Sequence, residues 1–96
     1  MNSENFLIIT IDSTHLVMKV EKFLVDSEVD VRIIPLPGEL KASCGLSLKA
    51  NIEDAHKILE LLIENNIDKN IYNFYLCEKN GFKKNFSTFN FSTFNF

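Results

Sequence analysis

Cys44 lies among small residues, in a segment that would suit a reactive thiol. The segment from Leu36 to Gly45 reads LPGELKASCG and separates two apolar runs, so we expect an exposed connection there. Ser43 and Gly45 add little side-chain bulk beside the sulfur, and a cysteine thiolate that reactants can reach is a nucleophile. The alternative is that Cys44 is only a small residue of a tight hairpin, and the local sequence favours neither interpretation.

Three polar residues that follow the first apolar run could support this chemistry: Ser13, Thr14 and His15. The two hydroxyl groups can cap the start of a helix or contact a ligand, and capping is the commoner role. His15 is a candidate proton carrier or anion partner, although a single surface histidine is more often structural. Free N–H groups at the start of a helix, together with a protonated His15, would favour the thiolate form of a nearby cysteine.

The other candidate residues are expected to have structural roles. Cys77 and Cys44 do not form a CxxC pair, and in a reducing compartment both are expected to be free thiols. Cys77 is expected to pack far from Cys44, and His56 lies off the apolar stripe of its helix and is expected to face solvent. The sequence has no Walker loop, zinc ligand set or catalytic triad, so we predict no metal site and no bound cofactor.

Six elements of secondary structure are predicted to position these residues. Apolar runs or alternation with period two indicate strands, and apolar residues at helical spacing indicate helices. The elements are a strand over 6–11, a helix from Thr14 to about Ser27, strands over 29–35 and 46–50, a helix that Asn51 caps and that ends near 65–66, and a strand over 71–77. This β-α-β-β-α-β order predicts the α+β class and a ferredoxin-like two-layer sandwich, in which an antiparallel sheet carries both helices on one face.

This topology gathers the polar residues at one edge of the sheet. The first two strands run in the same direction, so the end of the first strand, the start of the first helix and the loop after the second strand lie together. That edge would hold Asp12, residues 13–15 and Cys44.

Length, composition and charge limit the classes of function. Ninety-six residues, 46% hydrophobic and 24% charged, fit one compact domain, which we assign to residues 1–79. A net charge of −3 and scattered basic residues leave no basic field for nucleic acid or anionic lipid. No apolar run reaches the ~18 residues of a membrane-spanning helix, and the start MNSENF lacks the order of a signal peptide, so we expect a cytoplasmic protein that binds no membrane.

Residues 80–96 form a separate segment of low complexity. The pentamer NFSTF occurs at 85–89 and 90–94 and begins again at 95–96, and this segment holds six of the nine phenylalanines. A frayed repeat without a role is favoured over a segment that packs on the sheet, because chain ends are often unfixed. Alternation of Phe with Ser, Thr and Asn nevertheless favours strands.

The first and last predicted strands carry apolar residues on both faces. The sheet face away from the helices would then expose an apolar patch of roughly several hundred Å², and such a patch usually marks an interface. We predict a homodimer formed through the sheets, because two-fold dimers are the commonest assembly.

Four short motifs resemble the DUF3343 family of small bacterial proteins, which are described as selenium/sulfur carrier-like. The motifs are STH at 13–15, EKFL at 21–24, VRIIPLP at 31–37 and SCGLSL at 43–48, and the resemblance covers roughly residues 6–76. The resemblance implies a cysteine that holds sulfur or selenium, and this role falls on Cys44.

The residues and the resemblance together predict a carrier rather than an enzyme. Cys44 would accept sulfur or selenium covalently, as a persulfide or selenide, and exchange it with donor and acceptor proteins. The expected supporting residues are Ser13, Thr14, His15, Ser43 and Gly45. The alternative is a non-catalytic regulatory or protein-interaction module in which the cysteine is incidental, because the fold alone does not decide the function.

Overall fold

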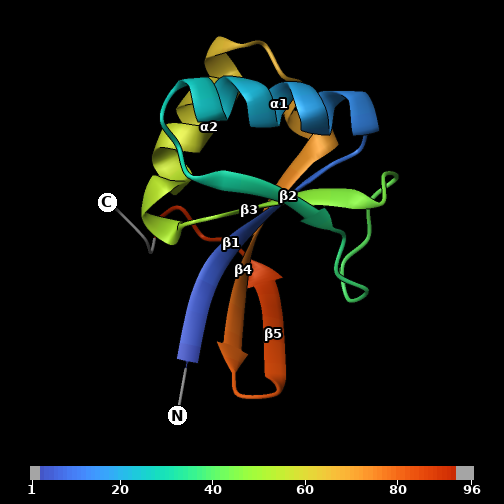
Figure 1. Cartoon of the computed structure of the whole chain (residues 1–96), viewed down its shortest axis with the longest axis vertical. Helices are drawn as coiled ribbons and strands as arrows, with labels where there is room; N and C mark the ends of the chain where they lie inside the picture. Colours follow the sequence, from blue (N-terminus) through green and yellow to red (C-terminus); the bar gives the residue numbers. More distant parts are fainter. Residues whose placement is uncertain (1–2, 93–96) are drawn as a thin grey trace.

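The computed structural model describes residues 3–92 of the chain, which form one sheet and two helices (Figure 1). The sheet lies below the helices in this view, and the loop between the second and third strands extends to one side of it. In chain order the elements are β1 (Ser3–Ile11), α1 (Thr14–Asp26), β2 (Val31–Pro35), β3 (Leu46–Ala50), the 3-10 turn η1 (Ile52–Asp54), α2 (Ala55–Glu64), the 3-10 turn η2 (Lys69–Ile71), β4 (Tyr72–Asn80) and β5 (Lys83–Thr88).

The strands form an antiparallel sheet in the order β2-β3-β1-β4-β5. The predicted α+β class is therefore confirmed. The predicted sheet had four strands, whereas the described residues form five, because the chain turns after β4 and pairs back along it. Gly81 in this turn has a φ of 62°, a left-handed conformation that glycine adopts without steric cost. The strand order thus differs from the predicted ferredoxin-like sandwich by an additional outer strand.

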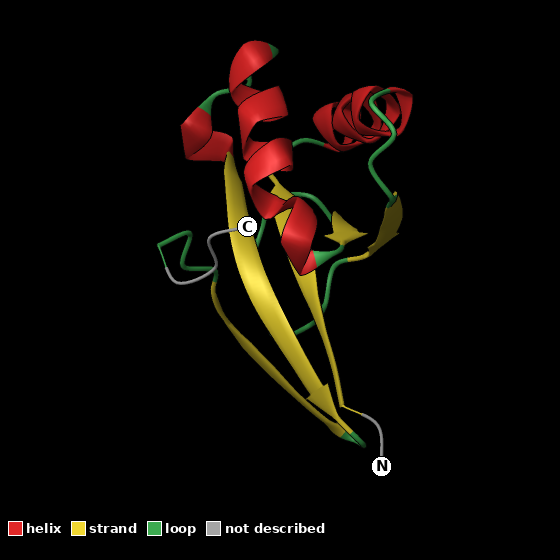
Figure 2. Ribbon diagram, turned by 90° about the vertical axis from the view of Figure 1, so that its left-hand side faces the viewer, coloured by secondary structure: helices red, strands yellow, loops and turns green. Residues whose placement is uncertain are grey.

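Both helices cover one face of this sheet (Figure 2). Val20 of α1 and Ile58 of α2 are fully buried and belong to one apolar cluster with Leu7 and Ile9 of β1. Successive residues of a strand point to opposite faces, so Ile8, which lies between these two, faces away from the helices. Full burial of one apolar side chain stabilises the folded state by about 1.5–3 kcal/mol. Most of the buried side chains lie in the cluster between the helices and the sheet, and this cluster is therefore the main core.

The face away from the helices carries a second, smaller apolar cluster. Ile8 and Cys77 are fully buried in it, and Leu40, from the loop between β2 and β3, covers them. Phe86 of β5 packs against the same cluster. The chain itself, through this loop and β5, therefore covers part of the apolar face that the sequence predicted.

The Phe-rich segment is packed against the sheet. Beyond β5, Phe89 is only 4% exposed, and its N–H donates a hydrogen bond to the carbonyl of Phe74 at 2.9 Å. The favoured interpretation of this segment as a frayed repeat is therefore wrong for residues 83–91, which contain a paired strand and a buried ring. Residues 93–96, which are the end of the second repeat and the start of the third, lie outside the described residues.

An aromatic contact joins this segment to α2. The ring of Phe91 lies edge-on to Phe74, with 5.1 Å between centroids, and edge-on to His56, with 5.2 Å. His56 was expected to face solvent, but it is half-buried and contacts the segment instead. The sequence could not indicate this contact, because the two rings come from positions far apart in the chain.

The ends of the two helices show where the predicted start of β2 and the predicted cap of α2 are wrong. Val29 was expected in a strand, but its N–H donates to the Leu24 carbonyl at 2.9 Å, and Glu28 before it has a φ of 65°. This hydrogen bond and this left-handed residue form a Schellman cap of α1, so β2 begins only at Val31. Asn51 makes no side-chain cap, and the turn η1 precedes α2.

Candidate functional site

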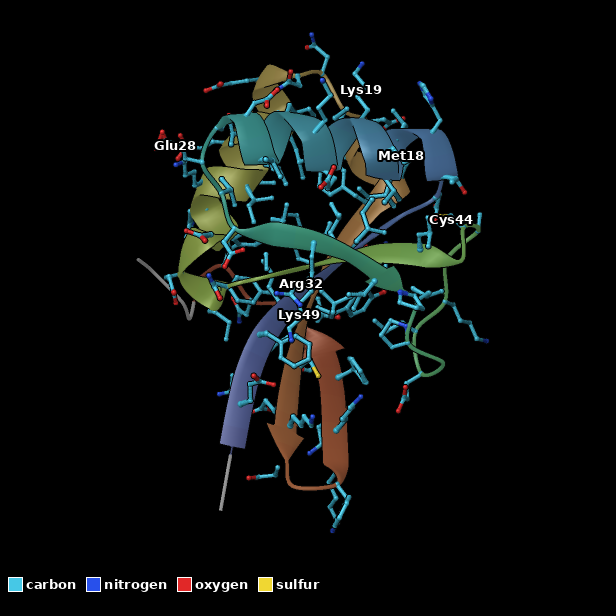
Figure 3. All side chains as sticks on the ribbon, viewed as in Figure 1. Met18, Lys19, Glu28, Arg32, Cys44 and Lys49 are labelled. Carbon is cyan, nitrogen blue, oxygen red and sulfur yellow. The ribbon has the colours of Figure 1, made fainter. Side chains whose placement is uncertain are left out.

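The side chain of Cys44 lies where the loop after β2 meets the start of α1 (Figure 3). The Thr14 hydroxyl donates a hydrogen bond to Sγ of Cys44 at 3.4 Å, and the Leu46 backbone N–H donates a second at 3.3 Å. The thiol can donate in turn to the Leu46 carbonyl at 3.6 Å. An N–H and an O–H donor therefore converge on one sulfur, and such donors bond more strongly to an ionised acceptor than to a neutral one.

Cys44 is not accessible in the way that the sequence indicated. Only 5% of its surface is exposed, and it belongs to the main apolar cluster beneath the helices. Ser43 and Gly45 on either side are exposed, so the chain directs the sulfur inward between two exposed residues. The expectation of an exposed cysteine is therefore wrong, because the loop lies against the start of α1 and turns the thiol toward it.

Asp12 connects the cysteine loop to the end of β1. The Ser43 N–H donates a hydrogen bond to Oδ1 of Asp12 at 3.2 Å. At the base of the loop, the Leu36 N–H donates to the Gly45 carbonyl at 2.9 Å. The end of β1, the start of α1 and the cysteine loop therefore lie together, as the strand directions predicted.

The other supporting residues have different positions. Ser13 is the N-cap of α1, because its side-chain oxygen accepts a hydrogen bond from the Leu16 N–H at 3.3 Å. His15 is exposed in the first turn, and the hydrogen bonds to the cysteine sulfur within residues 3–92 come from other residues. A Cβ at Gly45 would meet open space, so the fold does not require glycine there. Thr14 is the supporting residue whose side chain contacts the sulfur.

Two groups at this site make contacts that were not predicted from the sequence. The Leu46 N–H contacts the sulfur through the backbone, and a backbone donor leaves no signal in residue types. Asp12 was expected at this edge as an acceptor for the free N–H groups of the helix, whereas it accepts from the Ser43 N–H of the loop. The available signal was the position of Asp12 directly before the Ser-Thr pair that starts a helix.

Cys77 lies on the opposite face of the sheet, in the smaller apolar cluster, and is fully buried. Burial raises the pKa of its thiol, and the positive charge of Lys84 opposes this shift only in part. At neutral pH the raised pKa favours the protonated thiol of Cys77, which is the less nucleophilic form. This placement agrees with the packing role that the sequence indicated.

Stability should fall as the pH rises into the alkaline range. The folded protein holds the Cys77 proton more tightly than the unfolded chain, because its folded pKa is raised. The contribution is fully present below the unfolded pKa of about 8.5 and is lost as the pH rises through the folded value. We expect the free energy of unfolding, measured in urea, to decrease above about pH 8.5, and to decrease less in Cys77→Ala. Equal pH dependence in the two proteins would contradict this assignment.

Two further properties concern the described part of the chain. Among residues 3–92, neither helix has the length and apolar content needed to cross a membrane. The same residues contain no group of three or more His, Cys, Asp or Glu side chains placed to hold a metal ion.

One known family is recognisable in this chain. The sequence model of the family described as Putative Se/S carrier protein-like matches residues 6–73, from β1 into β4. The matched part includes Thr14, Cys44 and Leu46, which form the hydrogen-bonded thiol site. No curated protein and no solved structure matches the chain. Since the match covers more than half of the sequence, the protein belongs to this Se/S carrier-like family.

Proposed function

We propose that the protein carries sulfur or selenium on Cys44, as a persulfide or its selenium analogue with a sulfur–selenium bond, received from a donor protein and passed to an acceptor protein. The observation behind this proposal is the pair of hydrogen bonds that the sulfur accepts from Thr14 and Leu46. These donors stabilise an anionic sulfur, which is the form that attacks another chalcogen. The description of the family agrees with this role.

The transfer step is an exchange between sulfur atoms. The Cys44 thiolate attacks the outer sulfur of a donor persulfide, a sulfur–sulfur bond forms to Cys44, and the donor leaves as a thiolate when its own sulfur–sulfur bond breaks. Release repeats this exchange with an acceptor thiolate, so no oxidant or reductant is consumed. Selenium would move in the same way through a sulfur–selenium bond. The step requires an anionic sulfur and little acid–base assistance.

Because Cys44 is buried, part of its loop must open before transfer. One exposed hydrogen bond, from Ser43 to Asp12, connects the loop to the end of β1. A typical hydrogen bond contributes about 0.5–1.5 kcal/mol to the stability of the closed loop. Leu40 remains a firm anchor, since it is only 9% exposed on the other face of the sheet. Opening of residues 41–45 alone would expose the sulfur, and besides the bond to Asp12 it would break the hydrogen bonds from Thr14 to Sγ and from Leu36 to the Gly45 carbonyl.

Replacing Asp12 with alanine should accelerate alkylation of Cys44. Loss of the hydrogen bond to Ser43 raises the population of the open loop, and its expected contribution corresponds to a rate increase of about two- to tenfold. The rate is measured on the native protein with iodoacetamide, by mass spectrometry of the peptide that contains Cys44.

Two variants control this measurement. Asp12→Asn keeps an acceptor oxygen but removes the charge that strengthens the bond, so its rate should lie between those of the parent protein and Asp12→Ala. Asp26→Ala removes an exposed carboxylate at the other end of α1 and should have no effect. An unchanged rate in Asp12→Ala would show that another motion exposes the sulfur.

The burial of Cys44 favours a second candidate, a binding module in which the cysteine is incidental. The two functions differ in the relative reactivity of the two thiols. A carrier should be alkylated at Cys44 about tenfold or more faster than at Cys77, whereas a module should react slowly at both. Mass spectrometry of the protein isolated without reductant tests the proposal directly, since a carrier should hold one added sulfur or selenium on the Cys44 peptide and none on the Cys77 peptide.

A further inference from the structure

A groove crosses the sheet face that the helices leave uncovered. Its volume is about 640 Å³, and it lies between residues 39–41 of the cysteine loop and residues 84–88 of β5. Tyr75 and Phe86 are partly buried there and supply apolar surface. The loop residues that line the groove end three residues before Cys44, so an occupant would contact the loop that covers the thiol.

This face is positive, although the chain has a net charge of −3. Some charged residues lie at strand positions on the same face as Phe6 and Cys77, and others line this groove or a second hollow beside Phe6. Together they are five basic and three acidic side chains. The basic residues are Arg32, Lys41, Lys49, Lys79 and Lys84, and the acidic residues are Glu4, Asp30 and Glu39. The acidic excess of the chain therefore lies elsewhere.

Two pairs of like charges oppose each other directly across neighbouring strands. Arg32 of β2 lies opposite Lys49 of β3, and Lys79 of β4 lies opposite Lys84 of β5 (Figure 3 shows the first pair). Directly opposed like charges destabilise a sheet. The positive charge of Lys49 is partly compensated by the ring of Phe6, whose centroid is 4.3 Å from Nζ. The charge of Lys79 is partly compensated by Glu4, which lies opposite it on β1. An acidic ligand on this face would relieve the remaining repulsion.

β5 offers a backbone edge beside this groove. It is the outer strand of the sheet, and most of its residues are exposed. The outer edge of such a strand presents N–H and C=O groups with which an extended segment can pair. Lys83 and Lys84 at this edge oppose pairing with β5 of a second copy, because like charges would meet, and they attract an acidic segment.

We propose that β5 and the adjoining groove bind an extended acidic segment of a partner protein. The segment adds as a further strand along β5, directs acidic side chains toward Lys41 and Lys84, and places an apolar residue against Phe86. The homodimer predicted from the sequence would instead bring two positive faces together, which costs free energy. This docking does not depend on the chemistry of Cys44.

The probe is a synthetic peptide in which every second residue reads Glu, Val, Glu, with threonine between them, so that its strand places glutamate and valine on the same face. It is compared with the same peptide carrying lysine in place of glutamate and with a single-stranded oligothymidine. Binding to the full chain is followed by NMR chemical shifts. We expect only the acidic peptide to perturb residues 84–88, with an affinity that weakens as salt is added. Lys84→Glu should weaken this binding about tenfold or more, whereas Lys57→Glu, at an exposed position of α2, should leave it unchanged.

Four results would overturn the proposal. They are equal binding of the acidic and basic peptides, no loss of affinity in Lys84→Glu, tighter binding of the oligothymidine, and a stable dimer in light scattering that excludes the acidic peptide from β5. The third result would assign the face to nucleic acid, and the fourth would assign it to a second copy of the chain.

Discussion

The Cys44→Ser variant is expected to accept no sulfur from a persulfide donor, whereas the parent protein is expected to accept one sulfur on Cys44. Serine lacks the nucleophilic sulfur, so no sulfur–sulfur bond can form at this position. Cys77 cannot replace it, because it is fully buried on the other face of the sheet and burial raises its pKa. The intact mass of each protein after incubation with a small persulfide measures the loading.

This variant should keep its fold. The serine hydroxyl can accept the hydrogen bonds that Thr14 and Leu46 donate and can return one to the Leu46 carbonyl. We expect the free energy of unfolding to decrease by about 1 kcal/mol, which is small beside the 5–15 kcal/mol typical of a folded domain. Urea unfolding beside the loading assay therefore separates a loss of chemistry from a loss of structure.

Cys77→Ala is the matched control for the other thiol. It should load sulfur as the parent does, while the cavity that it leaves in the smaller cluster lowers stability by about 1–3 kcal/mol. Loading of Cys44→Ser at the parent level would exclude Cys44 as the carrier. Loss of loading in Cys77→Ala alone would move the carrier role to the opposite face of the sheet.

The neighbourhood of Cys44 could be predicted from the sequence, but its burial could not. Chain order and strand direction alone bring Asp12 and Thr14 to the edge where the cysteine loop lies. Burial depends on which residue of the loop turns inward, and Ser43, Cys44 and Gly45 are all small. No periodicity distinguishes them, because a loop has none. The Leu46 N–H that completes the site leaves no signal for another reason, because every residue except proline carries a backbone donor.

β5 carries conflicting signals in its sequence. Alternation of phenylalanine with small polar residues favours a strand, whereas repetition near a chain end favours fraying. In the structure the strand forms, and two features outside the repeat explain why. β4 extends to Asn80 and leaves a free edge, and Gly81 allows the chain to turn back along it. Neither property can be seen within the repeat itself.

Phe89→Ala is expected to lower the free energy of unfolding by about 3–5 kcal/mol, the usual cost of removing a buried phenylalanine ring. Phe89 is 4% exposed, its ring lies edge-on to Phe91 at 4.9 Å, and its N–H is bonded to the Phe74 carbonyl. Such a loss would be a large share of the stability of a small domain. Urea unfolding monitored by circular dichroism gives the value.

Phe82→Ala is a matched control from the same hairpin, because this ring is fully exposed and its removal should change stability by no more than about 0.5 kcal/mol. Both variants leave the same composition, so nonspecific apolar collapse of the whole Phe-rich segment would give equal losses, and a frayed segment would give none. A loss confined to Phe89 would make the chain beyond Asn80 part of the folded domain. A chain that ends at Lys79 would then lack both β5 and the Phe89 ring, and it should be less stable than Phe89→Ala.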